Sequence, residues 1–349
     1  MPSRPPAYAL AVGLAVGSSI LAVTTALVLD LPIRDPDGIA GPAYVRLPSI
    51  VLAFFVADVV PRALLRARGM RGFLPALSRV VRERWNLRRT GLVAVGLASF
   101  YATYVSYRNL KGALPFVRER LYDRPLLELD RAMAFGHDPS TVLHDLLGTG
   151  FAAHLLSAVY LLFLAFVPLS LGAALVWARR VRVGAFYVTA LSLNWLLGAA
   201  SYFLVPSLGP AFVRPALFAD LPRTGVTALQ ESLLETRLEV LADPDLATTI
   251  QGIAGFASLH VSIVFTGALV AHRLGLHRLV RWAMWLFLVL TVLATVYFGW
   301  HYVVDDIAGL LMGAFAVWLA ARATGFSREQ DQRTPAAGSP QHHASTAAE

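Results

Sequence analysis

A histidine and an aspartate stand four residues apart where one long apolar run ends and another begins, in the stretch Tyr297-Phe-Gly-Trp-His-Tyr-Val-Val-Asp-Asp306. If the backbone is helical there, His301 and Asp305 share a face, with Cβ atoms ~5–6 Å apart. A carboxylate at that distance can orient an imidazole. Ionisable groups within membrane segments usually face a cavity or a partner. We therefore interpret this pair as half of an active site.

A second candidate histidine stands at the start of another apolar run, in the segment from Gly252 to Val261. Glycines loosen the backbone of this segment, and a serine or the free N–H groups at a helix start bind anions well. Ser258 and His260 are therefore candidates for binding and proton transfer. Two apolar crossings separate His260 from His301, so both are expected on the same membrane face. A lone histidine in an apolar span is more often structural, but this constellation favours chemistry.

The composition is that of a membrane protein. The chain of 349 residues is 56% apolar and 15% charged, whereas soluble domains are ~25% charged, and its mean hydropathy is +0.59. The first apolar run has no clear cleavage site after a short apolar core, so we interpret it as a retained span. The chain has no cysteine, which excludes disulfides, thiolate catalysis and cysteine-ligated zinc. About eight windows are long enough to cross a bilayer, at residues 7–30, 47–65, 90–107, 150–177, 183–205, 257–275, 279–299 and 302–322.

We therefore predict an all-α fold, a polytopic membrane bundle of about eight transmembrane helices. Residues 1–89 would form two transmembrane helices followed by a basic amphipathic segment on the cytoplasmic surface, whose arginines alternate with apolar side chains. Residues 90–325 would form the membrane core that carries the candidate site. The polar tail, residues 326–349, has few apolar residues and is predicted to be disordered.

The net charge of +8 is best explained by topology. Residues 62–89 contain nine arginines and one acid, and arginines recur at 179–182 and 273–281. With eight spans these segments share a face with both termini, and the positive-inside rule makes that face cytoplasmic. The candidate site would then be extracytoplasmic, in a protein of the plasma membrane. Nucleic-acid binding would need a basic stripe with interleaved aromatics on one surface, so we do not expect it.

Several other polar residues are given structural roles. Asp58 is expected to form a helix-end ion pair with Arg62, and Asn194 an interhelical hydrogen bond. Residues 122–131 are expected to form a short helix on the outer surface, where most of its charges are structural. Residues 226–241 are expected to form an amphipathic outer helix that either covers the site or only packs on the surface. Two further histidines are expected to be exposed rather than catalytic, His137 and His144.

Lys111 is the single lysine among 30 basic residues. A chain that uses arginine almost everywhere and keeps one lysine suggests a need for an ammonium group, which binds phosphate as a compact point charge. The alternative is one residual lysine at a membrane surface. We list Lys111 as a phosphate-binding candidate, with Arg118 seven residues later.

At these positions the chain resembles the type 2 phosphatidic acid phosphatase superfamily and, more narrowly, the branch that includes the fungal inositol phosphorylceramide synthases. The family pattern consists of K-x-x-x-x-x-x-R-P, P-S-x-H and S-R-x-x-x-x-x-H-x-x-x-D elements. The corresponding residues here are Lys111 and Arg118, Ser258-Leu-His260, and His301-x-x-x-Asp305. The synthase-like branch has similar Phe-x-Ser-Leu-His and His-Tyr-x-Val-Asp runs. The resemblance covers roughly residues 90–322 and implies a six-helix phosphatase-like core.

The chain departs from the family pattern mainly at phosphate-binding positions. Non-family residues stand at Glu119, Ala257, Ala294 and Thr295, where the pattern has Pro, Pro, Ser and Arg. The synthase-like branch also lacks that arginine. The residues that would supply the missing positive charge are Arg118, Arg124 or Arg214.

The resemblance implies a mechanism that agrees with the chemistry of these residues. His301 would attack phosphorus, with Asp305 fixing its tautomer, and a phosphohistidine intermediate would form. His260 would protonate the leaving oxygen and then deprotonate water or an alcohol. Lys111, Arg118 and Ser258 would hold phosphate oxygens. The scheme needs no metal and no cofactor, and the partners would be a lipid phosphate substrate and the surrounding membrane lipids.

Other functions remain compatible with the sequence. Hydrolysis and transfer to a lipid alcohol share the intermediate and differ only in the acceptor, so an inositolphosphoryl or other headgroup transferase is the main alternative to a phosphatase. A metalloprotein could use His260, His301 and Asp305 as zinc ligands. A transporter or scaffold could keep the fold without turnover, although internal inverted repeats are not evident.

Overall fold

The computed structural model describes residues 6–36, 41–67, 69–178 and 180–326. Residues 327–349, most of the tail predicted to be disordered, lie outside these ranges. The described residues form helices and no strand, so the predicted all-α fold is confirmed. The helices are α1 (Ala9–Leu29), α2 (Ala43–Arg66), η1 (Met70–Gly72), α3 (Phe73–Arg84), α4 (Leu87–Val117), α5 (Asp123–Met133), α6 (Pro139–Leu147), α7 (Phe151–Val176), α8 (Val181–Leu204), α9 (Pro210–Val213), η2 (Pro215–Phe218), α10 (Gly225–Ala242), α11 (Leu259–Arg273), α12 (Arg278–Tyr297) and α13 (Val303–Thr324).

Six helices in the described part of the chain are long and apolar enough to cross a membrane: α1, α2, α7, α8, α12 and α13. The chain is therefore a multi-pass membrane protein by length and composition. Two predicted spans, 90–107 and 257–275, coincide with α4 and α11, which are not among these six. The 31-residue α4 has an uncharged stretch, 90–107, that is made less apolar by several Tyr, Ser and Thr residues. The other helix, α11, has only 15 residues, fewer than the ~20 a span needs.

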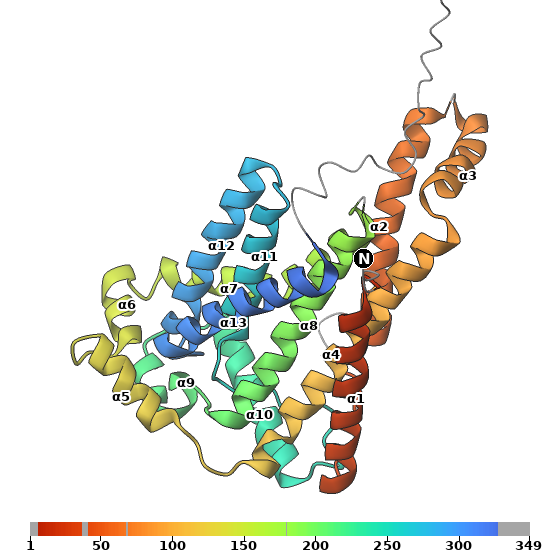
Figure 1. Ribbon diagram of the computed structural model, residues 1–349. Helices are drawn as coiled ribbons and strands as arrows, with labels where there is room; N and C mark the ends of the chain where they lie inside the picture. Colours follow the sequence, from red (N-terminus) through yellow and green to blue (C-terminus); the bar gives the residue numbers. More distant parts are fainter. Residues whose placement is uncertain (1–5, 37–40, 68, 179, 327–349) are drawn as a thin grey trace, which may run out of the picture.

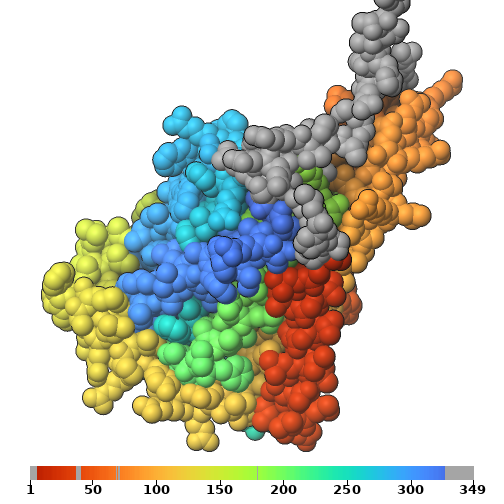
Figure 2. All heavy atoms as spheres, in the orientation of Figure 1, coloured from red at the N-terminus to blue at the C-terminus, as the bar shows by residue number. Residues whose placement is uncertain are grey.

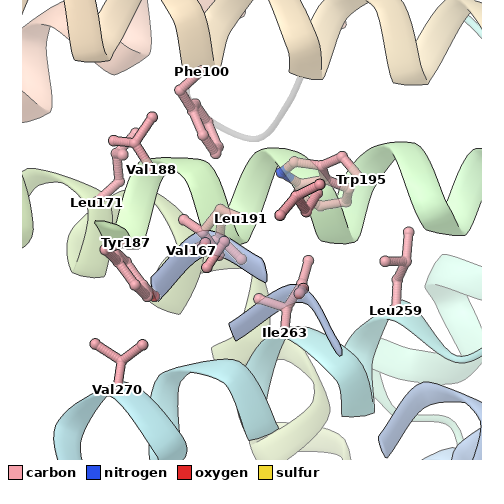
Figure 3. Close-up of a cluster of buried hydrophobic side chains, with 14 of the residues drawn as sticks. Phe100, Val167, Leu171, Tyr187, Val188, Leu191, Trp195, Leu259, Ile263 and Val270 are labelled. Atoms are coloured by element: carbon pink, nitrogen blue, oxygen red, sulfur yellow. The ribbon is translucent and has the colours of Figure 1, made fainter. Parts of the chain in front are cut away.

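The central helix of the bundle is α8. Of its most apolar stretch 78% is buried, against 17% for α1, because α8 contacts α1, α4, α7, α11 and α13. Figure 3 shows Phe100 of α4 on one side of α8, with Leu259, Ile263 and Val270 of α11 on the other. This core fixes α4 relative to α11, the two helices that carry Lys111 and His260.

The outer helices present apolar side chains outward, as lipid contact requires. Figure 2 shows α13 along one face of the molecule. Its exposed side chains Ile307, Leu311, Phe315 and Trp318 recur every three or four residues, which places them on one side of the helix. Its other side carries Gly309 and Gly313, where a Cβ would come within 2.7 Å or less of the α11 N-terminal backbone. The glycines thus let α13 pack closely against α11.

The expected structural roles of Asn194 and Asp58 are confirmed. Asn194 of α8 donates to Thr266 Oγ1 of α11 over 2.9 Å and accepts from the Ser262 hydroxyl. Asp58 of α2 pairs with Arg62 at 3.2 Å and also with Arg84 of α3 at 3.0 Å. The second pair ties the amphipathic helix α3 to the bundle.

The basic segments and the histidines lie at opposite ends of the bundle. Figure 1 shows α3 and the α11–α12 connection at one end, and α5, α9 and α10 towards the other. His260 at the start of α11 and His301 just before α13 belong to the α5 end, as the predicted number of crossings requires. The residue pattern thus separates the arginine-rich end from the end that carries the candidate chemistry.

Candidate active site

His301 lies in the turn between α12 and α13, so the helical backbone that was the condition for a shared face of His301 and Asp305 begins only after His301. Asp305 nevertheless reaches it, because Asp305 lies in the first turn of α13. The Asp305 Oδ2 atom accepts the Tyr302 N–H over 3.0 Å and lies 3.4 Å from His301 Nδ1, without hydrogen-bond geometry. One carboxylate therefore closes the start of α13 and faces the imidazole, so the helix start fixes the spacing of the pair.

The turn that carries His301 depends on Gly299, whose φ is +63°. A Cβ there would lie 2.2 Å from Phe218 Cζ and 2.9 Å from the Ala211 nitrogen. The Ala211 N–H also donates to the Gly299 carbonyl over 2.9 Å. The turn is therefore packed tightly against the α9–η2 segment, which limits where His301 can move.

His260 lies in the first turn of α11, opposite His301. The ring centroids of the two imidazoles are 6.1 Å apart. His260 stacks on Tyr160 at 4.4 Å and lies 4.1 Å from Phe163, both from α7. Tyr160 in turn stacks on Trp300, next to His301, at 5.1 Å. Aromatic rings of α7 thus support both histidines.

Ser258 joins the two histidine segments. It caps α11 by accepting the Val261 N–H over 3.4 Å, and its own N–H donates to the Asp305 carbonyl over 3.0 Å. Its side chain also lies near the carboxylate of Asp306. The structure thus brings together His260, His301, Asp305 and Ser258. The first and last of them, Ser258 and Asp305, are more than 40 residues apart in the sequence.

Asp306 is a site residue that the sequence analysis did not identify. Its Oδ2 accepts a hydrogen bond from Thr295 Oγ1 over 2.9 Å, and its carboxylate interacts electrostatically with His301. Thr295 stands where the family pattern has arginine. This chain therefore has at that position a neutral hydroxyl, bonded to a carboxylate, and no cation. Asp306 follows Asp305 directly, but helical spacing from His301 favours only Asp305, so the pattern gave no signal for it.

Lys111 extends from α4 towards the histidines. Its side chain is 9% exposed and its Nζ lies 4.9 Å from the centre of the Tyr202 ring. It is close enough to interact electrostatically with both His260 and His301. A buried ammonium beside two imidazoles can neutralise a phosphate there.

The three candidate arginines lie in different surroundings. Arg118 is half-buried at the end of α4. Arg124 pairs with Glu128 at 3.0 Å, and its side chain is 89% exposed. Arg214 pairs with Asp138 at 3.3 Å, a carboxylate that also binds Arg131. None of the three has a contact with His260 or His301 among the described interactions, and their phosphate-binding role stays a prediction.

Two buried carboxylates of α5 hold the loops around the site, whereas most charges of this segment were expected to be structural at the surface. Asp123 accepts from the Leu208 and Gly209 N–H groups over 3.0 and 2.9 Å and from the Tyr302 hydroxyl over 3.1 Å. Asp130 accepts the Val303 and Val304 N–H groups over 2.9 and 3.3 Å. Asp123 and Asp130 are seven residues apart and so share a helix face. This spacing is the feature of the sequence from which their common role could have been predicted.

The two other histidines of this end have non-catalytic surroundings. His137 is exposed. His144 is half-buried rather than exposed, and its Nε2 lies 2.8 Å from the Tyr297 carbonyl. Within the described residues, no group of three or more His, Cys, Asp or Glu side chains is placed to hold a metal ion. His260 and His301 form a pair of facing imidazoles, and the Asp305 carboxylate lies beside the His301 ring.

The comparison with known families matches this arrangement. The sequence model of the PAP2 superfamily matches residues 124–319, which is more than half of the chain and includes both histidines and Asp305. The chain belongs to the PAP2 superfamily. Phosphatase or phosphotransferase activity is therefore the expected type of function. The PAP2 match begins after Lys111 and Arg118, so it does not include the first motif. No curated protein and no solved structure matches the chain.

The pKa of His301, which lies outside the membrane-spanning helices, has a direct consequence for activity. Burial lowers this pKa to about 4, although the Asp306 carboxylate and a hydrogen bond with the Gly255 backbone oppose the shift. The imidazole is then neutral at physiological pH, as a nucleophile must be. In the unfolded chain the same group titrates near pH 6.5.

We expect the acidic limb of the kcat/KM profile, which reports protonation of His301, to lie below about pH 5 and not near pH 6.5. Because the unfolded state binds this proton more readily, the free energy of unfolding should decrease as the pH falls from about 6.5 towards 4. Turnover measured from pH 4 to 8, with circular dichroism at each pH, checks this. A decline centred at pH 6.5 in a folded protein would contradict a buried neutral His301.

Proposed function

We propose that this chain is a membrane enzyme that removes or transfers the phosphoryl group of a lipid-linked phosphate. The observation that carries the proposal is the pair of facing imidazoles, with ring centroids 6.1 Å apart. One imidazole has a carboxylate 3.4 Å away and both lie near a buried ammonium. A nucleophile, an acid and base, and a phosphate-binding cation are the parts that phosphoryl transfer requires.

The proposed reaction has two steps. In the first, the Nε2 lone pair of neutral His301 forms a bond to phosphorus, the bond from phosphorus to the lipid oxygen breaks, and the His260 imidazolium protonates that oxygen. In the second, His260 removes a proton from water, whose oxygen attacks phosphorus while the phosphorus–nitrogen bond breaks. Asp305 stabilises the cationic phosphohistidine. Lys111 and Ser258 bind phosphate oxygens, with Arg118, Arg124 or Arg214 as further candidates.

We further propose that the site opens on the extracytoplasmic side of the plasma membrane, with both termini cytoplasmic. The arginine-rich segments lie at the opposite end of the bundle from the histidines (Figure 1), and such segments stay cytoplasmic. A lipid substrate would keep its tails in the bilayer while its phosphate reaches His301. In this arrangement residues 90–325 form the catalytic core, and residues 1–89 supply two accessory helices and the basic amphipathic segment.

Transfer to a lipid alcohol is the second candidate function. The sequence features that favour it are the synthase-like runs Phe256-Ala-Ser-Leu-His260 and His301-Tyr-Val-Val-Asp305. A further feature is Thr295, which stands in place of the family arginine and donates a hydrogen bond to Asp306. The synthase-like branch also lacks that arginine. An inositolphosphoryl or other headgroup would then pass to the alcohol through the same two histidines.

The test is product analysis with purified protein given phosphatidic acid, a prenyl diphosphate and phosphatidylinositol, with and without a lipid alcohol. Release of inorganic phosphate supports the phosphatase, and a phosphorylated alcohol supports the transferase. The same assays with a chelator test the proposed independence from metal ions, which loss of activity would contradict. Turnover of no lipid phosphate would contradict the enzymatic proposal and favour a scaffold or transporter.

A further inference from the structure

Three cations around the segment 251–252 have no carboxylate at ion-pair distance in the described part of the chain, and one of them, Lys111, lies near both histidines. They are Arg108 and Lys111 of α4 and Arg237 of α10. Arg108 and Lys111 are three residues apart and so share one face of α4. The Nε atom of Arg108 is buried and has no hydrogen-bond partner among the described residues. Arg108 as a whole is half-buried, and a buried N–H of a charged group without an acceptor is costly, so this arrangement indicates an anion that arrives from outside.

The segment from Gln251 to Gly255 connects these cations to His301. Gln251 is fully buried, accepts from Arg237 Nη1 over 3.3 Å and donates to the Lys111 carbonyl over 2.8 Å. The Arg108 Nη1 atom lies 3.9 Å from the position that a Cβ would take at Gly252. At the other end of the segment, the Gly255 backbone hydrogen-bonds His301. The three cations therefore meet at one end of this segment, and His301 lies at its other end.

Lys111 and Arg108 are not equivalent in this arrangement. Lys111 interacts electrostatically with both imidazoles. Arg108 interacts electrostatically with Lys111 and Tyr107 and lies behind Lys111 as seen from the histidines. Arg237 interacts electrostatically with Asp123. The carboxylate oxygens of Asp123, however, already accept hydrogen bonds from two backbone N–H groups and the Tyr302 hydroxyl. Neither arginine has a carboxylate partner in an ion pair among the described residues, so both can bind an anion beyond the reacting phosphate.

We propose that Arg108 and Arg237 form a subsite for a second phosphate of the substrate, adjacent to the phosphate that Lys111 holds at the histidines. The inference rests on the proposed function and narrows its substrate class to a lipid diphosphate. A phosphate monoester carries about two negative charges, fewer than the three cations can neutralise. A second phosphate supplies the missing charge, and the planar guanidinium of arginine binds its oxygens in pairs.

The test compares a prenyl diphosphate with the prenyl monophosphate of the same chain length, using the full-length protein in lipid nanodiscs. Loss of a hydrogen bond to a charged group corresponds to about a tenfold change or more. We expect Arg108→Gln and Arg237→Gln each to lower kcat/KM for the diphosphate about tenfold more than for the monophosphate. Arg223→Gln is the matched control, because Arg223 is 82% exposed and pairs with Glu231. Equal losses with both substrates, or none, would overturn the subsite.

A binding measurement keeps this test separate from the enzymatic proposal. Titration of the wild-type protein with inorganic pyrophosphate and with orthophosphate gives two dissociation constants without any turnover. We expect pyrophosphate to bind at least about tenfold more tightly, and Arg108→Gln to remove that preference while leaving orthophosphate binding unchanged. Equal binding of both anions by the wild type would overturn the subsite. The pyrophosphate preference in a protein without turnover would uphold it while contradicting the proposed reaction.

Discussion

Replacing His301 with alanine is expected to lower turnover of a lipid phosphate at least ~10³-fold, because the variant has lost the atom that attacks phosphorus. The effect should appear in kcat. Substrate binding should change little, because in the proposed mechanism Lys111 and Ser258 still bind the phosphate. Steady-state phosphate release at saturating and limiting substrate separates the two parameters.

The matched control for this experiment is His137→Ala. His137 lies at the same end of the molecule but is exposed, so its loss should change turnover less than twofold. Circular dichroism and gel filtration of both variants exclude unfolding as the cause. If His301→Ala kept more than a tenth of wild-type activity while folded, His301 would not be the nucleophile.

The largest effect on stability is expected from Asp123→Ala. This change leaves two backbone N–H groups and the Tyr302 hydroxyl without their acceptor in a buried position. Each unsatisfied group costs about 1–3 kcal/mol, so we expect the free energy of unfolding to fall by at least about 3 kcal/mol. Because Tyr302 follows His301 directly, residual activity of the folded fraction should fall as well.

The control variant is Glu128→Ala on the same helix. Glu128 forms an exposed pair with Arg124, and exposed pairs contribute ~0–1 kcal/mol. Denaturation in detergent followed by circular dichroism measures both variants. Asp123→Asn, which keeps an acceptor oxygen, should fall between them. An Asp123→Ala protein as stable as Glu128→Ala would show that α5 does not hold the loops around the site.

The sequence predicted the parts of the fold that depend on long apolar runs. Length and composition place α1, α2, α7, α8, α12 and α13, because a helix that faces lipid must be apolar along its whole length. The same criterion was weaker for α4 and α11. The first contains several Tyr, Ser and Thr residues in its uncharged stretch, and the second is short and mostly buried. Their presence depends on packing against α8, which a hydropathy window does not measure.

The candidate site was predictable where spacing along the chain determines proximity. His301 and Asp305 are close because a helix begins between them, and the two histidines share a membrane face because two helices separate them. Proximity that comes from tertiary packing was not predictable. Asp123 and Asp130 reach the site from a separate surface helix, and Arg108 gains significance only because no acid lies beside it in the described structure.

The most direct test of the central claim is to detect the phosphohistidine. Wild-type protein mixed with a lipid substrate that carries ³²P on its reacting phosphate, then quenched in alkaline detergent within milliseconds, should carry label that is stable to base and lost in acid. The label should map to the peptide containing His301 and be absent from the His301→Ala protein. Turnover without labelled protein at any quench time, or label that persists in His301→Ala, would contradict His301 as the nucleophile.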